Sequence, residues 1–165
     1  RLGHFGIPPV LLSQALNIIV VQRLAPRLCQ ACVTEEEVPA DMLGDMRRLH
    51  LASAADKPAL PVSATMIRNL DRLHLLDANP GAQRLPRPVG CEACDRTGRK
   101  GRVPVVEVLA LHEDMRAVLA AGAPPAELLK QAEAAGQFVS FAQYARLLMA
   151  RKLLAPSDAV HIVAE

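Results

Sequence analysis

Two Cys-x-x-Cys pairs constrain the fold of this chain more than any other feature. They are Cys29-Gln30-Ala31-Cys32 and Cys91-Glu92-Ala93-Cys94, and they contain every cysteine in the sequence. Two sulfurs three positions apart can reach one metal ion from a single tight turn, so two such turns supply the four thiolates of a closed tetrahedral site. The pattern therefore predicts one structural zinc ion held by Cys29, Cys32, Cys91 and Cys94.

Four other interpretations of the cysteines stand beside zinc: a thioredoxin-like redox pair, an iron–sulfur cluster, disulfide bonds, and unrelated buried thiols. A redox pair needs only one Cys-x-x-Cys at a helix start. Disulfides are typical of secreted chains, and the sequence shows no secretory signal pattern. The doubled spacing favours zinc, although residues 33–90 separate the pairs by more than a compact zinc ribbon requires.

The composition predicts a folded protein that does not bind nucleic acid. Of its 165 residues, 51% are apolar and 22% charged, and the net charge is only +2. One Tyr, three Phe and no Trp leave few rings on which bases could stack. The apolar run Ile18–Val21 is far shorter than the roughly 20 residues that span a bilayer. Together with reduced cysteines, this predicts a cytoplasmic location.

A helix and then a strand are predicted to lead into the first cysteine pair. Pro8-Pro9 suits a helix start, because proline is tolerated in the first turn. The β-branched run Ile18–Val21 favours a strand that ends near Pro26. After the cysteine pair, the acidic run Glu35–Glu37 is expected to be a solvated face or a helix N-terminus.

The stretch between the cysteine pairs is predicted to contain two helices. Apolar residues recur at helical spacing in 42–49 and again in 66–73, and Ser63 is placed to cap the second helix. A linker rich in Ala and Pro, 52–61, separates the two. The stretch 84–89 contains two prolines and is at best an edge strand.

The part of the chain around and after the second cysteine pair is predicted to be a strand followed by helices. Gly90 and Gly98 flank the pair, and we expect their amides to turn toward the sulfurs. Residues 103–111 read as a Val-rich strand. A short helix is predicted at 113–121, and proline and serine start signals predict the later ones: 124–136, one capped by Ser140, and a final turn capped by Ser157.

These elements together predict an α+β fold that is mostly helical. If residues 20–24 pair antiparallel with 103–109, the cysteines lie where the strand pair opens into its long connection, and a metal ion would close that loop. Zinc binding contributes on the order of 10 to 16 kcal/mol in small sites that fold on binding. We therefore expect a small antiparallel β element clipped by the tetracysteine zinc site, a helical insertion held in place by the metal, and a helical C-terminal cap.

Several short motifs carry a resemblance to a known family. They are Gly6-Ile7-Pro8-Pro9, Val21-Gln22-Arg23-Leu24, Arg27-Leu28-Cys29 and, above all, Val89-Gly90-Cys91-Glu92-Ala93-Cys94-Asp95-Arg96-Thr97-Gly98-Arg99-Lys100-Gly101-Arg102. In these motifs the chain resembles the C-terminal region of the ATPases that drive type II secretion and type IV pilus assembly. The resemblance covers residues 1–33 and 86–121 well and the tail more loosely, whereas 36–85 have no counterpart.

The resemblance implies three parts and specific site residues. Residues 1–28 would end a RecA-like ATPase domain, 29–102 would form a tetracysteine metal-binding subdomain with a helical insertion, and 103–165 would add a strand and a helical C-terminal domain. The four cysteines are assigned to zinc, and Glu107 takes the family's acidic position. Arg102 is placed near the nucleotide phosphates, whose oxygens a guanidinium can chelate. The alternative for Arg102 is a surface arginine at a strand start.

The resemblance also implies a function. The chain, which begins at Arg1, is expected to be the zinc-stabilised, non-catalytic end of a hexameric cytoplasmic ATPase that powers type II protein secretion or type IV pilus assembly. It contains no GxxxxGK[ST] phosphate loop, so ATP and Mg²⁺ would bind only in the full-length protein. The expected partners are the upstream ATPase domain, neighbouring subunits and inner-membrane platform proteins, which would place the protein peripherally at the inner membrane.

Two other functions remain open. The stretch 91–98 matches one C-x-x-C-x-x-x-G repeat of cysteine-rich chaperones, which suggests a free-standing zinc-dependent interaction domain. A redox protein is the third hypothesis and would have cysteines that cycle with dithiol reagents. The histidines lack a metal-ligand spacing and a paired Cys or Asp, so no catalytic role is predicted for them: His4, His50, His74, His112 and His161.

Overall fold

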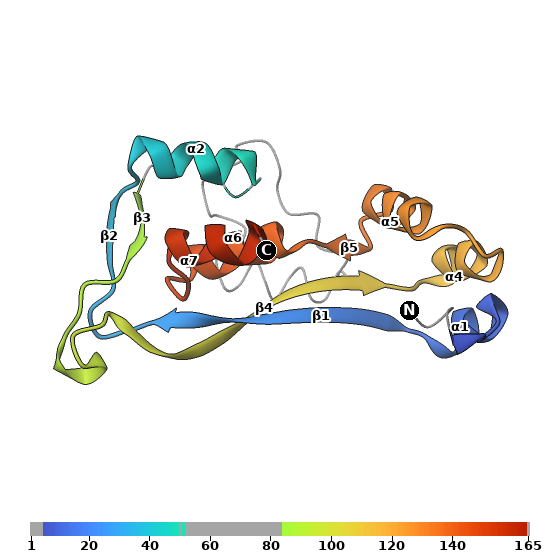
Figure 1. Cartoon of the computed structure of the whole chain (residues 1–165), viewed down its shortest axis with the longest axis horizontal. Coiled ribbons are helices and arrows are strands. Elements are labelled where there is room, and N and C mark those ends of the chain that lie inside the picture. Colours follow the sequence, from blue (N-terminus) through green and yellow to red (C-terminus); the bar gives the residue numbers. More distant parts are fainter. Residues whose placement is uncertain (1–4, 50, 52–83, 165) are drawn as a thin grey trace.

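The computed structural model describes residues 5–49, 51 and 84–164. The linker 52–61 and the helix predicted after Ser63 lie outside these residues. The described part combines helices with two small antiparallel sheets, in the order shown in Figure 1. The predicted α+β class is therefore confirmed.

A long two-stranded ribbon runs along the molecule (Figure 1). Strand β1, Ile18–Leu28, pairs antiparallel with strand β4, Arg99–Ala110, in a register that places Pro26 opposite Arg102. The register shifts after this pair, just before the first cysteines. Strand β5, Phe138–Val139, pairs with the other edge of β4, so the strand order is β1-β4-β5. The antiparallel pairing predicted from the sequence is confirmed.

The second sheet corrects the expectation of a helix start at the acidic run. Strand β2, Thr34–Glu37, pairs antiparallel with strand β3, Arg84–Arg87, and all four β2 residues are exposed. The run is therefore solvated, as predicted, but extended. Arginines on β3 explain the difference, because Arg87 forms an ion pair with Glu36 across the sheet and Arg84 donates to the Glu35 carbonyl. The prediction of a strand in 84–89 is confirmed.

The helices of the described residues agree with the predicted ones to within a few residues. Proline occupies the first helical turn of α1, α5 and α7, where its missing N–H has no intrahelical partner to lose. The helices are α1 (Pro9–Ala15), α2 (Ala40–Arg48), α4 (Glu113–Ala120), α5 (Pro125–Ala134), α6 (Phe141–Ala150) and α7 (Pro156–Ala164).

The main core lies between one face of the ribbon and helices α6 and α7 (Figure 1). Side chains alternate along a strand, so Val103 and Val105 share a face, and Ala25 lies opposite Val103 on that same face. All three are buried. Helices α6 and α7 and the segment that connects them contribute the buried side chains that face these residues: Ala142, Ala145, Leu148, Met149, Leu154, Ala159 and Ile162.

Helix α2 packs into the same core, which gives the insertion an anchor besides the metal that was expected to hold it. Met46 is 1% exposed and belongs to the core cluster, as does Leu51 just after the helix. Met42 and Leu49 pack against this cluster. Burying one such side chain contributes about 1.5 to 3 kcal/mol. At least this part of the insertion therefore has an anchor that is independent of the cysteines.

A smaller apolar cluster fastens the opposite end of the ribbon. It contains Leu111, Met115 and Ala132, with Leu16 packed against them. The Arg116 guanidinium adds hydrogen bonds to the Ser13 and Gln14 carbonyls and to the Asn17 side-chain oxygen. Carbonyls at a helix C-terminus have no intrahelical partner. Arg116 of α4 therefore caps α1 and ties the two helices together.

Ser140 caps α6 as predicted, whereas the cap predicted at Ser157 is wrong because α7 already begins at Pro156. The Ser140 Oγ accepts from the Gln143 N–H at 3.2 Å, and the Gln143 Oε1 accepts from the Ser140 N–H at 2.8 Å. We expect Ser140→Ala to lower the free energy of unfolding by about 1 kcal/mol, measured by urea unfolding followed by circular dichroism. The matched control Ser157→Ala should stay within about 0.5 kcal/mol of the unmodified chain. Equal losses of stability in the two variants would contradict the role of Ser140 as the cap of α6.

Candidate metal centre

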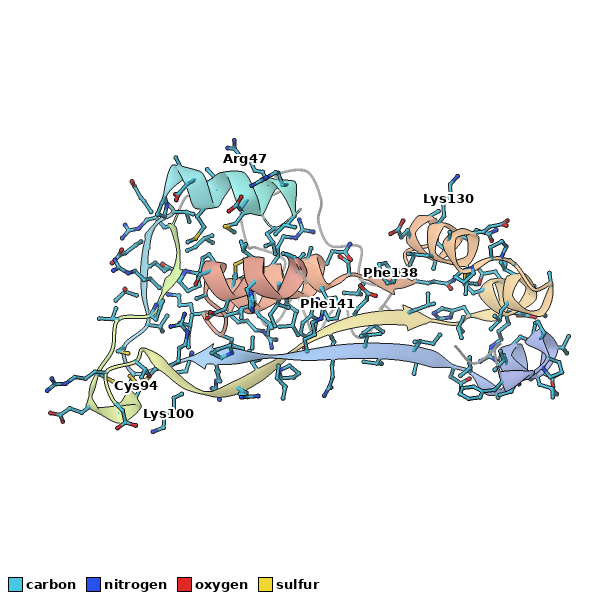
Figure 2. All side chains as sticks on the ribbon, in the orientation of Figure 1. Arg47, Cys94, Lys100, Lys130, Phe138 and Phe141 are labelled. Atoms are coloured by element: carbon cyan, nitrogen blue, oxygen red, sulfur yellow. The ribbon has the colours of Figure 1, made fainter. Side chains whose placement is uncertain are left out.

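The four cysteines lie where the two sheets meet. Cys29 directly follows β1, and Cys32 comes two residues before β2. Cys91 caps a short 3-10 helix, η2 (Glu92–Cys94), which lies between β3 and β4. Cys94 is labelled in Figure 2 at the end of the ribbon away from α1. The antiparallel strand pairs therefore bring together two segments that are far apart in the sequence.

The geometry of the sulfurs fits a tetrahedral metal ion. All four Sγ atoms lie within 4.8 Å of one another. Sγ–Sγ distances are 4.0 Å for Cys29–Cys91, 3.8 Å for Cys32–Cys94 and 3.8 Å for Cys91–Cys94. A tetrahedron with Zn–S bonds of about 2.3 Å has sulfur–sulfur edges of about 3.8 Å. Disulfide-bonded sulfurs would lie about 2.05 Å apart, so the spacing fits four separate ligands.

Both cysteine turns contain a hydrogen bond from the second cysteine N–H to the carbonyl of the first, and they differ in the residue that donates next. In the first, the N–H groups of Cys32 and Val33 donate to the Cys29 carbonyl at 3.2 and 3.0 Å. In the second, Cys94 and Arg96 donate to the Cys91 carbonyl at 3.2 and 2.9 Å. Each turn places its two thiols close to the same centre.

Gly98 joins the two turns. Its carbonyl accepts from the Cys29 N–H at 2.9 Å, and its own N–H donates to the Cys94 Sγ at 3.2 Å. It has a φ of +71° and is buried, a combination that favours glycine. The expectation that glycine amides turn toward the sulfurs is thus confirmed for Gly98. Burial raises the pKa of the Cys32 thiol, and a backbone hydrogen bond at Gly90, whose φ is +107°, partly opposes this effect.

Backbone donors and burial act in opposite directions on the thiols. Hydrogen bonding to the backbone at Cys91 and, next, at Gly98 lowers the pKa of the Cys94 thiol to about 6, against the effect of burial. Burial and, to a smaller extent, hydrogen bonds with the neighbouring thiols raise the pKa of the Cys32 thiol to about 11. A cation bound among the four sulfurs would offset the effect of burial on the thiol pKa values, because a thiol that coordinates a metal ion is deprotonated. Cys94 is therefore readily ionised in the free site, whereas Cys32 requires the bound metal ion to lose its proton.

The other candidate site residues are not part of the cysteine cluster. Arg102 is exposed in β4 and, because Val103 and Val105 face the core, lies on the opposite face of the ribbon. Glu107 is half-buried in the same strand. Among the histidines, His112 and His161 are described and do not belong to the cluster, while the other three fall outside the described residues.

Comparisons with known proteins give one consistent result. The model of the family described as "Type II/IV secretion system protein" matches residues 1–153. The chain is 31% identical to the type IV pilus assembly ATPase PilB of Myxococcus xanthus over 137 residues, covering 80% of this chain and 19% of that protein. It is 29% identical to the type II secretion system protein E of Klebsiella pneumoniae over 131 residues, covering 79% and 20%. The chain thus spans about a fifth of the length of these relatives.

The structure adds one observation on the membrane. No helix among residues 5–49, 51 and 84–164 has the length and apolar character needed to span a bilayer.

Proposed function

The chain belongs to the type II/IV secretion system protein family, and from this premise we propose that it is the zinc-binding C-terminal part of a hexameric cytoplasmic ATPase. The complete protein would power type II protein secretion or type IV pilus assembly. The proposal depends on one combined observation: the family match includes all four cysteines, and their sulfurs have the spacing of a tetrahedral site. Relatives from both the pilus and the secretion branches support the general function equally.

Zinc would have a structural role in this site. Cys29, Cys32, Cys91 and Cys94 would each supply one thiolate, and a zinc ion with four protein ligands has no open position for water or substrate. The ion supplies a neutralising charge and a cross-link. The chain's own residues arrange the sulfurs through the two turns and the Gly98 backbone. The site accordingly has no part in ATP chemistry.

We further propose the three-part division of the chain, with residues 1–28 completing a RecA-like ATPase domain, 29–102 forming the metal-binding subdomain and 103–165 the C-terminal domain. A strip of exposed apolar side chains on β1 indicates that another domain packs against residues 1–28 in the complete protein. Ile18, Val20 and Leu24 of β1 are 54%, 52% and 51% exposed and share the ribbon face away from α6 and α7. A long exposed apolar edge strand is normally covered by another element.

The partner that would cover this strip is the upstream ATPase domain of the same protein. Neighbouring subunits of the hexamer and inner-membrane platform proteins are the further partners, and they would hold the protein at the membrane. The relatives, named as a pilus assembly ATPase and a secretion system protein, support partners of this kind. Helices α6 and α7, packed on the other ribbon face, would leave the strip accessible for this contact.

Arg102 is proposed to contact nucleotide phosphates in the complete protein. In that protein, which should carry an upstream GxxxxGK[ST] loop, we expect Arg102→Gln to lower the rate of ATP hydrolysis at least about tenfold. A hydrogen bond to a charged group contributes about 1.5 to 3 kcal/mol, and 1.4 kcal/mol corresponds to a factor of ten. The measurement is steady-state phosphate release at saturating ATP.

Arg27→Gln is the matched control, because Arg27 is also an exposed arginine of the ribbon. Arg27→Gln should keep the rate of ATP hydrolysis within about twofold of that of the unmodified protein. Equal effects of the two substitutions would reject a specific role for Arg102. A complete reading frame without the phosphate loop and without ATP hydrolysis would reject the motor function and favour the free-standing zinc-dependent interaction domain.

A further inference from the structure

Both cysteine-bearing segments contact the same third segment, the corner between α6 and α7, which we define as residues 151–158. On the first segment, the Leu28 N–H donates to the Leu153 carbonyl at 2.9 Å. The Gln30 side-chain amide donates to the Lys152 carbonyl at 2.8 Å. These hydrogen bonds lie immediately before Cys29 and immediately after it.

The second segment reaches the corner through an ion pair. The Arg99 guanidinium binds the Asp158 carboxylate with two hydrogen bonds, Nε to Oδ2 at 3.0 Å and Nη2 to Oδ1 at 3.1 Å. The two side chains are only 34% and 17% exposed. A two-pronged, partly buried pair of this kind fixes orientation better than a single contact at the surface. Asp158 lies in the first turn of α7, where a carboxylate is favoured.

The corner itself has a defined shape. Lys152 adopts a φ of +56°, which is uncommon for a residue other than glycine. Its Nζ forms an ion pair with Glu35 at 3.3 Å, so the same residue contacts the chain inside the first cysteine turn, at Gln30, and just after it. Leu154 and Ala155, at the centre of the corner, are buried in or beside the main core. The corner is therefore held by the core and in turn holds the cysteine segments.

From these contacts we propose that the α6–α7 corner is a scaffold that holds the two cysteine pairs in place before the metal binds, with Arg99 and Asp158 as its positioning pair. This inference rests on the zinc site proposed above. A site ordered in advance binds more tightly, because less conformational freedom is lost on binding. The coupling is reciprocal, so zinc must stabilise the corner by the same factor by which the corner strengthens zinc binding.

The experiment measures zinc affinity by chelator competition in the reduced chain, with and without Asp158→Asn. The expected dissociation constant for zinc rises about tenfold, as it does when groups supporting metal ligands are lost. Arg99→Gln should have the same effect, and the double variant should be no weaker than either single one, because the two residues act as a pair. Asp45→Asn is the matched control, because Asp45 pairs with Arg48 within α2.

Two further measurements separate positioning from general destabilisation. The Co²⁺ form of Asp158→Asn should keep the absorption spectrum of a tetrahedral thiolate site while binding more weakly. Zinc should slow amide hydrogen exchange in 151–158 in the unmodified chain and do so less in the variant. If the single variants do not fold, the exchanged pair Arg99→Asp with Asp158→Arg should restore zinc affinity to within about threefold, and failure to do so would overturn the proposal.

The outcomes are distinguishable from those of the zinc proposal. A chain that binds no zinc refutes both the metal site and the scaffold. Zinc affinity that is within twofold of the unmodified chain in Asp158→Asn, or is lowered equally by Asp45→Asn, refutes the scaffold alone.

Discussion

Replacing Cys94 with serine is expected to weaken zinc binding about a hundredfold. Four thiolates that share about 12 kcal/mol of binding free energy supply about 3 kcal/mol each, and 1.4 kcal/mol corresponds to a factor of ten. Cys94 is 4% exposed and accepts N–H donors from Cys91 and Gly98. A serine oxygen would leave these donors without a sulfur and the metal without its fourth thiolate. The measurements are zinc content by mass spectrometry and chelator competition.

The control for this substitution lies one residue away. Ala93→Ser introduces the same side chain at an exposed position of the same turn and should keep about one zinc per chain. In Cys94→Ser, limited proteolysis should increase first at 33–38 and 84–90, whereas α2 should resist longer because Met46 lies in the main core. Full zinc content in Cys94→Ser, or equal loss in Ala93→Ser, would contradict the tetrathiolate site.

Replacing Gly98 with alanine is expected to lower the free energy of unfolding by about 2 to 5 kcal/mol. A side chain at its φ of +71° costs about 1 to 2 kcal/mol. In addition, a Cβ atom would lie 2.6 Å from the Cβ of Pro88 and 2.9 Å from its Cα. Relieving this overlap displaces backbone that holds Cys29 and Cys94, which adds a further strain of about 1 to 3 kcal/mol. Urea unfolding of the zinc-loaded chain measures the loss.

Gly101→Ala is the control for Gly98→Ala. Gly101 has a similar φ of +77°, but a Cβ there would meet nothing within 4 Å. Only the backbone strain remains, so the expected loss is about 1 to 2 kcal/mol. If the two variants lose equal stability, the close approach of Pro88 is not what makes Gly98 necessary.

The sequence was most informative where local spacing determines the chemistry. Two Cys-x-x-Cys pairs predict sulfurs that converge, and convergence requires the strands beside them to meet. The antiparallel pairing of β1 with β4 follows from that requirement and from the Val-rich runs on both sides. The role of Gly98 was predictable for the same reason, because a backbone N–H can turn toward a cysteine sulfur most easily where glycine permits a positive φ. Helix starts at proline or serine were equally local signals.

What could not be predicted depends on partners distant in the sequence. An acidic run has the same pattern on a solvated helix and in an exposed strand, and only the arginines of β3 make Glu35–Glu37 a strand. The apolar stripe of α2 predicts a buried face without saying what covers it, so its place in the core with α7 was missed. Nothing near Arg99 or Asp158 indicates that they bind each other, because ion pairing requires no sequence pattern.

The two fastened ends of the ribbon determine how the molecule responds to force. At one end Arg116 holds the C-terminus of α1, and at the other the sulfurs and the Gly98 carbonyl link the two turns. An eleven-residue strand such as β1 is about 35 Å long. Stretching or shearing it would require many ladder hydrogen bonds to break together, each worth about 1 kcal/mol. The ribbon should therefore act as a stiff lever, so that a tilt of α1 is delivered across that length as a displacement of the cysteine end.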